Sequence, residues 1–321
     1  MKLTVGWDGT DERLVLARQL GVSHLKVDVG AYLSQGRRGP PRRDKLRTDK
    51  KRIEAHDLRI GVALLPQEPH SQHWNIRIGG PEREQEIKDV CETVSILGGE
   101  GIPVVEYVFN LAGVFGSQQR ATGRGGATVR HFDYESARQA PAEASYAASV
   151  DEVWSRITYF LEHVVTTAEA AGVKLACHPD DPPVARVRGE TRVLGSWEGL
   201  VRLIETVPSA ANGLNFCQGT IAEMGVDVIK AIRYFGSRDK IHHVHFRNVK
   251  GSVPRFEESF IDDGDVDMHS ALRAYKQVGY NGTIMPDHWP TMGNDSPLLG
   301  WTYSVGYLKA MMHELEVLER G

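Results

Sequence analysis

The chain has few cysteines, no strong excess of charge of either sign and no long apolar run. Its three cysteines, Cys91, Cys177 and Cys217, are too few and too scattered among 321 residues to form a disulfide framework. A formal net charge of −4 gives no electrostatic reason to expect a nucleic-acid partner. No uncharged apolar stretch could span a bilayer, and no secretory leader pattern opens the chain. We therefore expect no nucleic-acid or membrane partner and predict a cytoplasmic location.

Short apolar runs instead alternate with amphipathic segments along the whole chain. Strands are predicted at 3–7, 24–29, 59–65, 102–110, 173–178, 213–217, 241–248 and 283–287. Helices are predicted at 11–20, 45–56, 82–97, 150–171, 196–207, 221–235, 267–278 and 303–318. This order predicts an α/β fold, a (β/α)8 TIM barrel that forms a single catalytic domain over 1–321. An open doubly wound sheet is the alternative, but no G-x-G-x-x-G follows the first strand.

Two long connections, 31–43 and 111–149, interrupt this order. Each follows a predicted strand, so each should lie at the C-terminal face of the barrel, where barrel enzymes keep their active sites. The second is predicted to be a structureless lid loop. It carries Arg120, Arg124 and Arg130, which as a group could clamp a carboxylate, although any single arginine in such a loop is more often simply solvated.

Four predicted strands end in side chains that bind metal ions. If these segments are alternating strands of one barrel, their donors meet at one rim. Side-chain alternation directs His178, Cys217, His245 and Asp287 inward, whereas Cys177 faces the helices and belongs to the core. Each could alone be an ordinary buried residue, but together they would be costly to bury without an ion. The donor set suits Mn²⁺, Fe²⁺, Co²⁺ or Zn²⁺ better than Ca²⁺ or Mg²⁺.

Several motifs resemble those of the D-mannonate dehydratase family, within the xylose-isomerase-like barrel group. They are HPDDPP at 178–183, LNFCQGT at 214–220, HFRNV at 245–249, FEESF at 256–260 and PDH at 286–288. The resemblance implies a divalent metal, usually Mn²⁺, and dehydration of D-mannonate to 2-keto-3-deoxy-D-gluconate. It also implies the same four metal ligands that alternation selects.

Two residues are predicted to transfer protons. His288 follows a ligand carboxylate, and its imidazole could protonate the leaving hydroxyl or could only steady Asp287. The family has a tyrosine in a Pro-Gly-Tyr context after this point, where this chain reads SPLLGWTY at 296–303. Tyr303 is the first candidate to replace that tyrosine; Tyr307 could also replace it, or the role could be lost. Strand one departs as well, with Gly6 and Asp8 in place of the arginine and tyrosine common in the family.

Three residues are predicted to bind the substrate. Arg247, one step beyond His245 on the same face, could hold the substrate carboxylate, or could form a structural salt bridge to Glu257 or Asp287. Trp74 follows the third strand and should line the sugar pocket. Arg124 belongs to the arginine-rich connection described above.

Two other functions stay open at this point. A metal-dependent sugar isomerase or epimerase would need a second inward carboxylate, which Glu106 could supply. A catalytically impaired homologue could bind a sugar acid without converting it. The predicted partner is a small-molecule sugar-acid substrate, and assembly into a homo-oligomer is left open.

Overall fold

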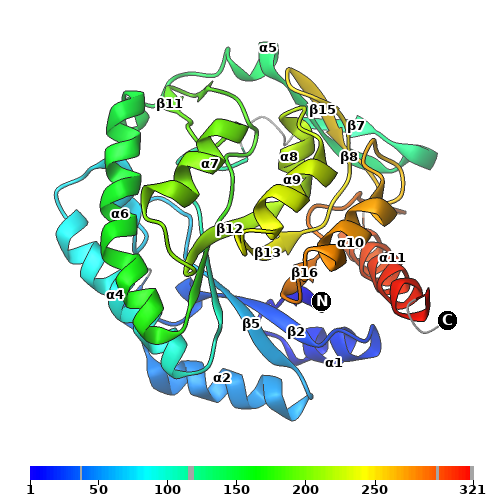
Figure 1. Ribbon diagram of the computed structural model, residues 1–321, viewed down its shortest axis with the longest axis horizontal. Helices are drawn as coiled ribbons and strands as arrows, with labels where there is room; N and C mark the ends of the chain where they lie inside the picture. The colour runs from blue at the N-terminus through cyan, green and yellow to red at the C-terminus, as the bar shows by residue number, and fades with distance from the viewer. Residues whose placement is uncertain (37, 115–118, 294–295, 319–321) are drawn as a thin grey trace.

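The centre of the molecule is a closed barrel of parallel strands (Figure 1). It is seen in a computed structural model that describes residues 1–36, 38–114, 119–293 and 296–318. The prediction of a (β/α)8 barrel is confirmed, and all eight predicted strands are present. Around the barrel they are β1 Lys2–Gly6, β16 Thr283–Met285, β13 Ile241–His245, β12 Asn212–Cys217, β9 Lys174–Cys177, β6 Val104–Tyr107, β5 Arg59–Leu64 and β2 His24–Asp28.

Helices cover the outside of the barrel (Figure 1). The longer ones are α1 Asp11–Gln19, α2 Arg43–Ala55, α4 Arg83–Gly99, α6 Val150–Ala171, α7 Trp197–Thr206, α9 Val228–Gly236, α10 Met268–Gln277 and α11 Pro297–Leu318. α6 shows why these segments form helices: Ser149 and Glu152 make a capping box at its start, and Gly172 ends it with φ 65°. Among the described residues, no helix is both long enough and apolar enough to cross a membrane.

The barrel strands are buried on both faces, because helices cover one side and side chains fill the other. β12 and β13 are buried at every position. Phe216 and Val244 belong to the hydrophobic core, as alternation predicts for the helix-facing side. Asn215 and His245 contact each other on the inside of the barrel, with Asn215 Nδ2 3.2 Å from His245 Nε2.

The predicted helix at 221–235 is wrong as a single element. It consists of α8 Gln218–Glu223 and α9 Val228–Gly236. Gly225 has φ 74° between them, and the Asp227 side chain accepts from the Lys230 amide at the start of α9. A left-handed glycine and a new N-cap separate two helices that a continuous apolar pattern had joined.

The long connections are not structureless, which corrects the prediction. The first contains the hairpin β3 Leu33–Gln35 and β4 Arg38–Pro41. The second contains β7 Gln119–Thr122, β8 Thr128–Asp133 and the short helix α5 Tyr134–Ala137. β7 and β8 form an antiparallel sheet with β14 Val249–Ser252 and β15 Arg255–Glu258 (Figure 1).

This four-stranded sheet has a small core of its own. Phe132 of β8 stacks on Phe256 of β15 with ring centroids 5.1 Å apart. The two strands lie far apart in the sequence, so neither segment alone reveals its partner. That pairing places β8 directly over the C-terminal end of the barrel, where the site lies.

Candidate metal centre and active site

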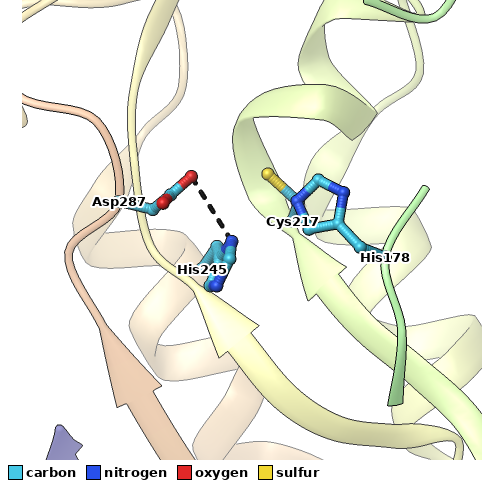
Figure 2. Close-up of side chains that lie close together, drawn as sticks. All are labelled: His178, Cys217, His245 and Asp287. Atoms are coloured by element: carbon cyan, nitrogen blue, oxygen red, sulfur yellow. Dashed lines mark ion pairs between the residues drawn. The ribbon is translucent and has the colours of Figure 1, made fainter. Parts of the chain in front are cut away.

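Four donor side chains converge at the C-terminal ends of four barrel strands (Figure 2). His178 follows β9, Cys217 ends β12, His245 ends β13 and Asp287 follows β16. One donor atom from each lies within 4.8 Å of the others. Cys217 and His245 are paired in the β12–β13 register, so they stand at the same height. These strands are adjacent in the barrel, not alternating as expected, because the strand order here follows the chain.

The donors are oriented as a cation would require. His178 Nδ1 lies 2.7 Å from the carbonyl of Pro179 and donates to it, which leaves Nε2 to face the cluster. His245 Nδ1 is buried, has no hydrogen-bond partner among the described residues and lies 3.3 Å from Asp287 Oδ2. A divalent cation would supply the missing partner, and two imidazoles, a thiolate and a carboxylate form a set that borderline transition metals accept.

The electrostatics of the cluster also favour a divalent cation. Burial raises the pKa of Cys217, but the charges of Arg247 and His178 outweigh it and hold the thiol well below its usual range. Burial lowers the pKa of His178, but the Cys217 thiolate opposes it and raises the value to about 9. His245 and Asp287 act on each other in the same way. Burial lowers the pKa of His245, but the charge of Asp287 outweighs it and raises the value; burial raises the pKa of Asp287, but the charge of His245 outweighs it and holds the value well below 3.8. Each anionic ligand thus favours the protonated form of a neighbouring imidazole, and a divalent ion would supply positive charge in place of those protons.

Arg247 lies behind the cluster, in a buried network of acidic residues. Its side chain is 2% exposed, and its terminal nitrogens lie 2.7 Å from Asp181 Oδ2 and 2.5 Å from Glu223 Oε1. Nε lies 3.4 Å from Asp287 Oδ2. A Cβ at Gly219 would lie 2.5 Å from Arg247 Cζ, so the glycine makes room for the guanidinium. Both terminal nitrogens are engaged by protein carboxylates, and this placement does not favour substrate binding by Arg247.

His288 is placed beside the cluster by an unusual backbone conformation. Its φ is 44°, a left-handed value that is uncommon for a residue other than glycine and that often marks functional sites. The turn lets Asp287 and His288 face the same cavity although they are neighbours in sequence. His288 Nδ1 lies 2.8 Å from Glu258 Oε2, and Arg130 Nη1 donates to Nε2 at 3.0 Å.

A cavity of about 360 Å³ opens onto the donors, and its lining includes Lys26, Glu106, Arg130, His245 and His288. Lys26 Nζ lies 3.1 Å from Glu106 Oε2 and 3.3 Å from His245 Nε2. Burial raises the pKa of Glu106, but Lys26 and His245 outweigh it and lower the value to about 2. Sequence reasoning missed Lys26, although a lysine between two apolar positions of a barrel strand is a visible indication of an inward charge.

Three other residues predicted to act in the site are not among the described residues that line this cavity. Trp74 is buried at the start of α3 Trp74–Ile78 and packs edge-on against Tyr146, with ring centroids 6.1 Å apart. Arg124 pairs with Asp262 at 2.8 Å. Tyr303 lies on α11, with its hydroxyl 3.5 Å from Arg124. The structure therefore brings His288 to the donors but leaves Tyr303, Trp74 and Arg124 apart from them.

Comparisons with known proteins agree with this geometry. The family model of D-mannonate dehydratase (UxuA) matches residues 138–319. A curated relative, mannonate dehydratase 2 of Halalkalibacterium halodurans, is 29% identical over 97% of this chain and 99% of its own length. The mannonate dehydratase of Streptococcus agalactiae shows the same identity and coverage.

Solved structures give the same result. The crystal structure of mannonate dehydratase from Streptococcus suis matches with a TM-score of 0.87 and 25% identity, over 97% of this chain and 92% of that one. A D-psicose 3-epimerase from Clostridium cellulolyticum matches with a TM-score of 0.65 and 13% identity, over 98% of this chain and 99% of its own, which shows the shared barrel fold alone. With its barrel, its motifs and a family match over more than half of its length, the chain belongs to the D-mannonate dehydratase family.

Proposed function

We propose that the chain catalyses the metal-dependent dehydration of D-mannonate to 2-keto-3-deoxy-D-gluconate, as a hydro-lyase. The observation that carries this proposal is the convergence of His178, Cys217, His245 and Asp287 within 4.8 Å at four adjacent strand ends. We propose these side chains as the metal ligands and Mn²⁺ as the ion. The metal would polarise the substrate carboxylate and 2-hydroxyl and stabilise the negative charge that develops when C2 loses its proton.

His288 is the proposed general acid. Loss of water breaks the C3–O bond, and the departing hydroxyl needs a proton. The imidazole faces the same cavity as the ligands, and Glu258, 2.8 Å from Nδ1, orients the ring. Nε2 is the nitrogen left to carry the proton, so the substrate must displace Arg130 from its 3.0 Å contact with that atom. The enol that remains then tautomerises to the 2-keto acid.

Arg247 is proposed as a positioning residue and not as the holder of the substrate carboxylate. Its charge favours the thiolate of Cys217, and its Nε lies 3.4 Å from Asp287, so it keeps both anionic ligands ionised. Lys26 holds Glu106 in an ion pair at the side of the cavity. That pairing does not favour Glu106 as the second carboxylate that an isomerase would use to move protons.

Incubation of metal-loaded protein with D-mannonate, followed by an assay for 2-keto acid, tests the proposal. Formation of a 2-keto acid supports the dehydratase. Formation of a 2-ketose supports an isomerase instead, and tight binding without product supports a sugar-acid binding homologue.

Four features stay predictions: a single catalytic domain over 1–321, a lid at 111–149, a cytoplasmic location and assembly into a homo-oligomer. Part of the predicted lid, 115–118, lies outside the described residues.

A further inference from the structure

A second cavity, of about 570 Å³, adjoins the first and is lined by arginines. The two cavities share Arg130, Asp287 and His288 in their lining. The second one is also lined by Arg13 and Arg120. One wall therefore separates the candidate metal centre from a space rich in positive charge.

The arrangement of the arginines is costly without an anion. Arg120 and Arg130 are directly paired in the antiparallel β7–β8 ladder, so both side chains project from the same face. Like charges in directly opposite positions destabilise a strand pair. The exposed side chain of Arg120 has no ion-pair or hydrogen-bond partner among the residues described in the structure. An oxyanion between the two guanidinium groups would offset their repulsion.

Few negative charges on the cavity wall compete for these two arginines. Asp287, the one acidic residue in the lining, is directed to His245 at 3.3 Å and to Arg247 at 3.4 Å. Arg13 is already paired with Asp8 at 3.2 Å, and Arg130 Nε lies 3.8 Å from the buried carboxylate of Glu258, which leaves Arg120 as the arginine of this lining without an ion pair among the described residues. Gly6 keeps the cavity open, since a Cβ there would meet nothing within 4 Å.

We propose that this cavity is an oxyanion site, in which Arg120 and Arg130 bind a carboxylate or phosphate group next to His288. The anion has two chemical sources: the far end of a sugar acid that is anionic at both ends, or a separate anion. The site's role in turnover rests on the proposed dehydratase function, whereas anion binding itself does not. Guanidinium groups bind planar oxyanions through paired, charge-assisted hydrogen bonds.

Calorimetric titration of metal-loaded protein with inorganic phosphate, after removal of excess ion, tests the site. Arg120→Gln removes one guanidinium, and Gly6→Leu places a side chain in the cavity while all of its arginines are kept. Each should weaken phosphate binding at least about tenfold, because one charge-assisted contact changes affinity by that order. Arg255→Gln is the matched control: Arg255 lies in the same sheet, pairs with Asp133 at 2.7 Å and does not line the cavity. It should leave phosphate affinity unchanged.

Comparison of D-mannonate with D-mannarate, which has a carboxylate at both ends, distinguishes the two sources. If the site takes the far end of the substrate, D-mannarate should bind about tenfold more tightly than D-mannonate in the wild type. That advantage should vanish in Arg120→Gln, and phosphate should compete with D-mannarate. If a separate anion is bound, the two acids bind equally and phosphate alters D-mannonate turnover.

The proposal is overturned if neither phosphate binding nor the preference for D-mannarate depends on Arg120 and Gly6. The affinities of phosphate and D-mannarate are measured at equilibrium, and their effects on the turnover of D-mannonate are measured separately. A wild-type protein that binds phosphate through Arg120 but makes no 2-keto acid would defeat the proposed function and leave the oxyanion site standing.

Discussion

Binding of a divalent ion should release up to two protons from the protein, one from each imidazole of the cluster. Without the ion, His178 has a pKa of about 9 and carries a proton at neutral pH, and Asp287 raises the pKa of His245, so this imidazole keeps its proton to a higher pH than a free histidine does. Cys217 and Asp287 contribute none, because their pKa values are held well below the usual range and both are already ionised. A metal ion binds only the neutral imidazoles, so it must displace both protons.

The magnitude follows from this count. Two protons displaced per ion make the dissociation constant of the metal fall about 100-fold for each unit rise in pH. This slope should hold above the lowered pKa values of Cys217 and Asp287 and flatten as the pH rises through the raised pKa values of the two imidazoles. Metal affinity is therefore lost as the pH falls. Titration calorimetry of Mn²⁺ into metal-free protein, in buffers of different ionisation enthalpy, counts the protons directly.

Cys217→Ser sharpens the experiment. It removes the thiolate that raises the pKa of His178, so the number of protons released should fall towards one, and the ion should bind more weakly while the barrel stays folded. Cys91→Ser is the matched control, because Cys91 is a half-buried thiol with Sγ 3.7 Å from the His163 carbonyl, outside the cluster. Release of no protons by the wild type, or full metal content in purified Cys217→Ser, would refute this account of the site.

Three further predictions test the surroundings of the centre. His288→Asn should keep the metal, the fold and KM but lower kcat by about 10²–10⁴-fold, because Asn has similar hydrogen-bonding groups and cannot titrate; turnover restored by saturating Mn²⁺ would show that His288 only steadies Asp287. Gly219→Ala should lower the free energy of unfolding by about 1–3 kcal/mol and weaken metal binding, since its Cβ would lie 2.5 Å from Arg247 Cζ; an unchanged melting temperature and metal content would count against that contact. The segment 111–149, including 115–118 outside the described residues, should show slower amide exchange when substrate is bound, and equal protection in both states would count against a lid.

The parts of the fold that depend on local pattern could be predicted from the sequence. Side chains alternate along a strand with a period of two, so the inward positions of His178, Cys217 and His245 follow from their neighbours alone. The structure brings these side chains together with Asp287. The predicted bounds of α6 are identical to the observed 150–171, because a capping box and a terminal glycine mark its ends.

The parts of the site that depend on contacts between distant segments could not be predicted from the sequence. Arg247 follows the end of β13, and its partners Asp181 and Glu223 come from two other segments; burial among them does not favour the predicted substrate contact. Tyr303 stands where the sequence departs from the family's motif, and α11, which starts at Pro297, carries it to Arg124 instead of to the donors.

By itself, then, the sequence determined a barrel with four inward side chains of the types that bind metals at its strand ends, because period and composition are local properties of the chain. Only the tertiary structure decided what surrounds them. The sheet that joins β8 to β15 places Arg130 and Glu258 on either side of His288. Backbone pairing between strands so far apart is set by how the whole chain packs, and no short stretch of sequence specifies it.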